Sequence, residues 1–110
     1  MSVQQVHFTD ANFDAESRKG VCVVCFEEPT DHDCRKQVKN IERAADEFTE
    51  KIKVGPCDVE TCSALAKRFC VTSIPTTIIL KNGEEVERLV GHRHETTLVK
   101  HLRKDVGQGT

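Results

Sequence analysis

Residues 21–34 read Val21-Cys22-Val23-Val24-Cys25-Phe26-Glu27-Glu28-Pro29-Thr30-Asp31-His32-Asp33-Cys34, and this stretch decides how the chain folds. Its first six residues are apolar and rich in valine, which is typical of a strand buried on both faces. A polar loop follows, and a segment of helical periodicity begins at Cys34. Because α/β proteins place reactive groups where a strand leads through a loop into a helix, we expect the functional site here.

Length and composition limit what the chain can be. Its 110 residues suffice for one domain with one core, so we expect residues 1–110 to form a single domain. The net charge is −2 with acids and bases mixed along the chain, which predicts no nucleic-acid partner. No apolar run approaches the ~20 residues of a membrane span, so no membrane association is expected. Residues 1–5 lack the features of a signal peptide, which favours a cytoplasmic location.

The pattern of apolar residues predicts nine elements. We expect strands over residues 3–8, 21–26, 51–57, 76–80 and 85–90, and helices over residues 11–18, 34–48, 60–69 and 95–106. The Thr9-Asp10 pair is the predicted cap of the first helix, Pro56 should lie at a strand end or edge, and residues 107–110 should be a frayed tail.

The connections between these elements define the fold class. Asn82-Gly83 is a hairpin signal, so the last two strands should be antiparallel. Strands separated by helices run parallel through right-handed crossovers. The sequence therefore predicts an α/β fold with a central mixed five-stranded sheet flanked by four helices.

Several short motifs together resemble the thioredoxin family. They are Val24-Cys25-Phe26, Cys34-Arg35, Val54 with Asp58-Val59, Val71-Thr72-Ser73-Ile74-Pro75-Thr76, Lys81-Asn82-Gly83 and Gly91. The resemblance spans nearly the whole chain and implies the thioredoxin fold. Fold alone does not define activity, which depends on the residues at the site.

The resemblance also implies that the reactive motif is altered. The family carries Trp-Cys-Gly-Pro-Cys at the start of its second helix, and this chain carries Thr30-Asp31-His32-Asp33-Cys34 at that position. Only the second cysteine is kept, as Cys34. Cys25 stands where the family has a buried aspartate. Since a carboxylate cannot undergo thiol–disulfide exchange, we expect disulfide reductase activity to be absent or very low, unlike a conventional protein-disulfide reductase.

Asp31 suits the place that it occupies. Aspartate is among the best N-cap residues, and its charge matches the positive end of a helix. We therefore predict that Asp31 caps the helix and imitates the charge of the missing thiolate. For the lone thiol of Cys34, the helix dipole lowers the pKa while burial and the charges of Asp31 and Asp33 raise it. The sequence leaves that balance open.

The family's peptide-binding surface is retained in this interpretation. The resemblance assigns a cis-proline turn to Ile74-Pro75, flanked by Gly91 and His92, with Thr30 and His32 on the facing loop. We call these residues the predicted peptide groove. A protein or peptide partner beside Pro75 follows from the resemblance, and a binding or redox-regulatory module is the first functional hypothesis. The alternative is a monothiol redox protein that is glutathionylated or forms mixed disulfides at Cys34, with a Cys25–Cys34 disulfide as a variant.

The remaining cysteines and histidines are interpreted as structural or solvated residues. Outside the loop, the cysteines are expected to be reduced structural thiols, because disulfide frameworks belong to small secreted chains. Zinc could use Asp31, His32, Asp33 and Cys34, or Cys57 and Cys62, but neither spacing is typical of a zinc site, so no metal and no cofactor are predicted. His92 and His94 are expected to be solvated loop residues. A monomer is predicted, with oxidative dimerisation through Cys62 left open.

Overall fold

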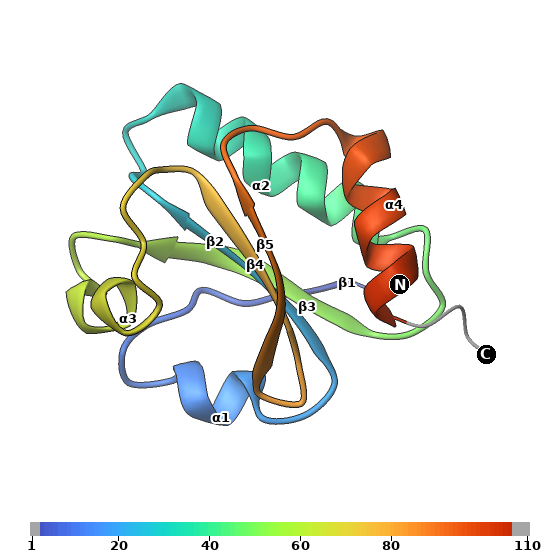
Figure 1. The fold of residues 1–110 in the computed structure, drawn as a ribbon, viewed down its shortest axis with the longest axis horizontal. Coiled ribbons are helices and arrows are strands. Elements are labelled where there is room, and N and C mark those ends of the chain that lie inside the picture. The colour runs from blue at the N-terminus through green and yellow to red at the C-terminus, as the bar shows by residue number, and fades with distance from the viewer. Residues whose placement is uncertain (1–2, 107–110) are drawn as a thin grey trace.

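The computed structural model describes residues 3–106 and confirms the predicted α/β architecture. Its elements are β1 (Val3–Gln5), α1 (Phe13–Ser17), β2 (Val21–Glu27), α2 (His32–Ala45), β3 (Ile52–Asp58), α3 (Ser63–Arg68), β4 (Thr76–Lys81), β5 (Glu84–Val90) and α4 (Glu95–Val106). Within these residues, the strands form one sheet in the order β1-β3-β2-β4-β5. Strand β3 runs parallel to β1 and β2, whereas β4 is antiparallel to β2 and β5. Helices α2 and α4 cover one face, and α1 and α3 lie on the other (Figure 1).

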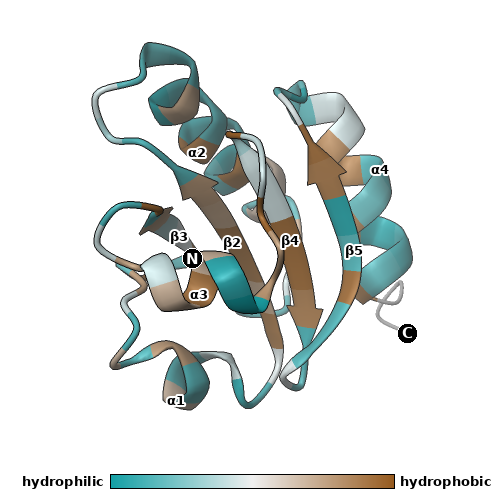
Figure 2. Cartoon of the chain, turned by 60° about the vertical axis from the view of Figure 1, so that its left-hand side comes forward, coloured by the Kyte–Doolittle hydropathy of each residue, from teal (hydrophilic) through white to brown (hydrophobic). Residues whose placement is uncertain are grey.

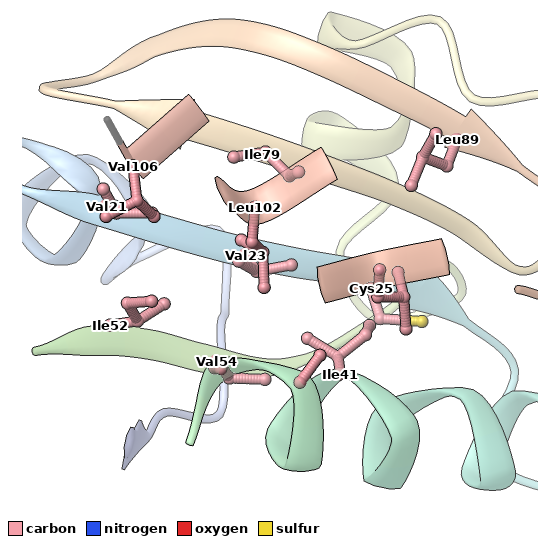
Figure 3. Packing of buried hydrophobic residues seen from close by; sticks show 13 residues of the cluster. Val21, Val23, Cys25, Ile41, Ile52, Val54, Ile79, Leu89, Leu102 and Val106 are labelled. Carbon is pink, nitrogen blue, oxygen red and sulfur yellow. The ribbon is translucent and has the colours of Figure 1, made fainter. Parts of the chain in front are cut away.

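Strand β2 is the centre of both hydrophobic cores. All seven of its residues are buried, as the apolar run predicts. Val21, Val23 and Cys25 point toward α2 and α4, where they join Ile41 and Leu102 in one cluster (Figure 3). The alternate residues of β2 enter a second cluster on the opposite face, together with Phe8, Phe13 and Leu65. In Figure 2, the central strands are hydrophobic, and the helices on either side of them have hydrophilic outer faces.

The predicted first strand and first helix differ in extent from those of the structure. Strand β1 ends at Gln5 rather than at residue 8, although the backbone N–H groups of Val6 and Phe8 still donate to β3. Helix α1 begins only at Phe13, and in the turn before it the Thr9 hydroxyl accepts a hydrogen bond from the N–H of Asn12 at 3.0 Å while Asn12 Oδ1 accepts one from the N–H of Thr9 at 2.8 Å. This reciprocal pair is a capping box, so Thr9 caps the turn that leads into α1, as predicted, although the residue directly before α1 is Asn12.

Pro56 lies inside β3, which corrects the expectation that it marks a strand end or edge. Its carbonyl oxygen accepts a hydrogen bond from the N–H of Phe8 at 3.1 Å. In a parallel pair, the N–H and C=O of one residue point to the same side, so the missing N–H of Pro56 faces residues 6–8. β1 has already ended there, so no ladder hydrogen bond is lost.

The predicted tail at residues 107–110 lies outside the described residues. Within residues 3–106, no helix is long and apolar enough to cross a membrane.

Charged side chains of β5 and α4 meet around two carboxyl groups, those of Glu87 and Asp105. Glu87 of β5 contacts His101 of α4, and its Oε1 lies 3.4 Å from Lys104 Nζ. Burial and the neighbouring carboxyl of Glu87 raise the pKa of Asp105 to about 7, against the weaker opposing charges of Lys104 and Lys81. Burial would also raise the pKa of Glu87, but the hydrogen bond with Asp105 and the charges of His101 and Lys104 lower it. The two carboxyls thus share one proton up to near-neutral pH.

This pair predicts that stability falls as the pH rises. A carboxyl whose pKa is raised on folding, from 3.8 to about 7 for Asp105, binds its proton more tightly in the folded state. Its contribution is therefore present at acidic pH and is lost as the pH approaches and passes 7. We expect urea unfolding midpoints to decline between about pH 4 and pH 7 and to level off above that. Asp105→Asn, which keeps a donor toward Glu87 at every pH, should flatten this decline, and an unchanged decline in this variant would contradict the assignment.

Candidate functional site

The predicted site residues gather at one edge of the sheet. Phe26 near the end of β2 pairs with Thr76 at the start of β4, and Thr76 pairs with Val90 at the end of β5. The loop before α2, the Ile74-Pro75 turn and residues 91–92 therefore lie next to one another at this edge. The Ile74–Pro75 bond is cis, as the resemblance implied. Gly91 has a φ of 92°, which favours glycine, and its N–H donates to the carbonyl of Pro75 at 2.8 Å.

Asp31 is the N-cap of α2, which confirms the predicted cap. Its Oδ1 accepts hydrogen bonds from the N–H groups of Asp33 at 2.9 Å and Cys34 at 3.2 Å. These are two of the N–H groups that have no partner inside a helix, and a charged acceptor also suits the helix dipole. Because the cap starts the helix, α2 begins at His32 rather than at Cys34 as predicted.

The thiol of Cys34 is buried in the first turn of α2. The residue is 0% exposed, and its pKa is raised. Burial is the largest cause, and the charges of Asp31, Glu27 and Asp33 add to it, while a backbone hydrogen bond from Glu28 opposes them. Burial therefore decides the balance that the sequence left open, and Cys34 is poorly suited to form a thiolate.

Beneath Cys34, β2 contributes a second buried thiol. Cys25 is also 0% exposed and stands opposite Thr77 in the β2–β4 register. Its pKa is raised by burial and then by the charges of Glu27 and Cys34, whereas the neighbouring hydroxyl of Thr77 opposes this shift. Since ionised sulfur is disfavoured at both positions, this part of the site favours neutral thiols.

Thr30 in the loop and His32 at the first position of α2 are both exposed. Thr30 Oγ1 donates to Glu28 Oε1 at 3.3 Å. His32 Nδ1 lies 3.0 Å from the guanidinium of Arg35, which also donates to the carbonyl of Pro29 at 3.2 Å. These contacts order the loop and leave both side chains accessible to a ligand.

Two residues of α2 that the sequence analysis did not single out hold the segment after Gly91. Gln37 is 0% exposed, and its Oε1 accepts a hydrogen bond from the N–H of Arg93 at 2.6 Å. Asn40 Nδ2 donates to the carbonyl of Arg93 at 3.3 Å and lies 3.4 Å from His92 Nε2. The helical spacing between Gln37 and Ile41 places both on the buried face, which is the signal that could have identified Gln37.

The other cysteines are unpaired, and one differs from the prediction. Cys22, Cys57 and Cys62 are buried, as expected for structural thiols. Cys70 is exposed, because α3 has ended at Arg68 and Cys70 adopts a left-handed φ of 54°. At 2% exposure, Cys62 would need local opening to link two chains. Among residues 3–106, no group of three or more histidine, cysteine or acidic side chains is arranged to hold a metal ion.

The sequence matches known proteins over most of its length. Residues 4–104 match the thioredoxin family. A thioredoxin from Bacillus subtilis is 33% identical over 99 residues, covering 90% of this chain and 95% of the relative. The chain belongs to the thioredoxin family. A thioredoxin from Staphylococcus saprophyticus is 32% identical over the same shares of both chains.

A solved structure confirms the thioredoxin fold. It is a mutant thioredoxin from Halobacterium salinarum NRC-1, which superposes with a TM-score of 0.77 and 24% identity, covering 94% of this chain and 89% of that chain. At this level of identity the likeness supports the thioredoxin fold alone. The chemistry of this family member depends on its own residues at the start of α2.

Proposed function

We propose that this chain is a thioredoxin-family protein that binds extended protein segments beside Pro75 without running the dithiol cycle. The observation that carries the proposal is the N-cap of α2, where a carboxylate accepts the two hydrogen bonds from Asp33 and Cys34. By the motif resemblance around Phe26 and Cys34, Asp31 takes the place of the attacking cysteine. A carboxylate there stabilises the helix but cannot form a mixed disulfide.

The alternative is a monothiol protein that uses Cys34. Its complete burial and raised pKa count against this role, because an attacking sulfur must be both exposed and ionised. The exposed loop residues Thr30 and His32, the turn at Ile74 and the Gly91–Pro75 hydrogen bond support docking instead. Binding without turnover needs only this edge of the sheet.

The first test separates docking from catalysis. In a dithiothreitol-driven insulin assay, the native chain and Cys34→Ser should both reduce insulin at the background rate. Peptides selected on the native chain from a random library should bind Cys34→Ser with unchanged affinity. Ile74→Arg should lower the affinity for these peptides at least ~10-fold, about 1.4 kcal/mol. Val86→Arg, a matched change at an exposed position of β5, should leave the affinity unchanged.

Two results would count against the proposal. Insulin reduction by the native chain at the rate of a two-cysteine thioredoxin would overturn it directly. Peptide binding that is lost in Cys34→Ser, together with a mass increase at Cys34 that dithiothreitol reverses, would favour the monothiol alternative.

A further inference from the structure

A basic pocket lies between α2 and residues 92–94. It encloses about 390 Å³ and is lined by Lys36, Lys39, Asn40, Arg43, His92 and His94. This lining contains no acidic side chain, although the whole chain has a net charge of −2. The basic pocket is therefore a locally cationic patch on a chain whose net charge is negative.

The helical cations of the basic pocket repel one another. Lys36, Lys39 and Arg43 follow one another at intervals of three and four residues, which places them on one face of α2. Like charges at this spacing destabilise a helix. All three side chains are exposed, and none forms an ion pair with a carboxylate of residues 3–106. Glu42 and Asp46 lie three residues from Lys39 and Arg43 and offset part of this repulsion, and an anionic ligand would relieve the rest.

The opposite wall of the basic pocket is held in position by α2 itself. Gln37 and Asn40 bond to the N–H and the carbonyl of Arg93, at 2.6 and 3.3 Å. His92 and His94 flank this anchored residue, and their rings meet edge to face with centroids 6.1 Å apart. In Figure 1, the segment between β5 and α4 passes close to α2, in agreement with these bonds. A ligand therefore meets a wall that is already ordered, which lowers the entropy lost on binding.

We propose that the basic pocket accepts an acidic segment, with neighbouring Asp or Glu side chains, of the protein that binds beside Pro75. This inference rests on the proposed function, because His92 lines the basic pocket and also belongs to the predicted peptide groove. A chain lying along the groove can thus continue into the basic pocket. Carboxylates match its ammonium, guanidinium and imidazole donors. A long nucleic acid is a poorer match, because the mixed charges elsewhere on this acidic chain give it no continuous basic track.

The pocket can be tested without a groove ligand. Acetylated tetraglutamate should shift the backbone amide NMR signals of Lys39, Asn40 and His92, whereas tetraglutamine should not. Because the contact is electrostatic, its affinity should fall at least tenfold between about 50 and about 500 mM salt. Lys39→Gln combined with Arg43→Gln should abolish binding. The control, Lys19→Gln with Lys67→Gln, removes two exposed cations outside the pocket lining and should leave binding unchanged.

A second arm separates this inference from the proposed function. A peptide selected for the groove should bind at least ~10-fold more tightly when four glutamates, rather than four glutamines, are added on its side toward His92. Equal affinities would overturn the basic-pocket assignment and leave groove binding intact. Tetraglutamate binding without any groove ligand would support the pocket while the proposed function fails. Tighter binding of tetrathymidylate than of tetraglutamate would overturn the assignment to an acidic protein segment.

Discussion

Replacing Gly55 by alanine should lower the free energy of unfolding by about 3 kcal/mol or more, or prevent folding altogether. Gly55 lies in β3 directly beneath the backbone of Val6. A Cβ at this position would stand 1.5 Å from the carbonyl oxygen of Val6 and 2.6 Å from its carbonyl carbon. Backbone atoms cannot rotate away as a side chain can, so residues 6–8 would have to leave β3. The hydrogen bonds from Val6 and Phe8 to β3 would then be lost.

Gly20→Ala provides the matched control for Gly55→Ala. Gly20 has a φ of 77°, but a Cβ there meets nothing within 4 Å. The cost should therefore be the conformational strain alone, about 1 kcal/mol. Urea unfolding of both variants measures the difference. If Gly55→Ala were no more destabilising than Gly20→Ala, the backbone of Val6 would not lie against Gly55 as described.

Asp31→Cys should raise the rate of insulin reduction at least tenfold above that of the native chain. The substitution pairs Cys34 with a second cysteine three residues earlier, in the spacing of the family motif, and the new thiol lies at the helix N-terminus. There, the free N–H groups and the dipole lower the pKa of a cysteine and favour its thiolate. Cys34 would then resolve the mixed disulfide. The same change removes the cap bonds to Asp33 and Cys34, so it should cost about 1 kcal/mol of stability.

Two further variants show whether the Asp31→Cys gain comes from the new thiol. Asp31→Asn keeps a good capping side chain without a nucleophile, so its stability should be near that of the native chain and its activity at background. Asp31→Cys combined with Cys34→Ser should trap a mixed disulfide with substrate and not turn over. An unchanged rate in Asp31→Cys would mean that the thiol environment, rather than the missing sulfur, limits activity.

Features that depend on neighbouring residues could be predicted from the sequence. The apolar run of β2 predicted a strand buried on both faces, and Asn82-Gly83 predicted the hairpin, where both residues have positive φ angles of 52° and 87°. The cap by Asp31 was predictable for the same reason, because it joins a side chain to N–H groups two and three residues later.

Features that depend on distant residues were not predictable. Gln37 and Arg93 are 56 residues apart, and their hydrogen bond exists only because α2 and the end of β5 meet at one edge. The Glu87–Asp105 pair likewise requires the packing of α4 on β5. Cys70 is unpaired, as expected, but its exposure was not predictable, since it follows the end of α3 in a left-handed conformation and helix ends are the least certain part of a pattern.

The anchoring of residue 93 through its main chain has an evolutionary consequence. Within residues 3–106, the hydrogen bonds from α2 to Arg93 reach its N–H and its carbonyl and not its side chain, so another side chain at this position should leave the wall beside Lys36 and Lys39 in place. Proline is the exception, since it has no N–H to offer Gln37. Relatives could therefore exchange the residue at position 93 to suit different targets while inheriting the same backbone path.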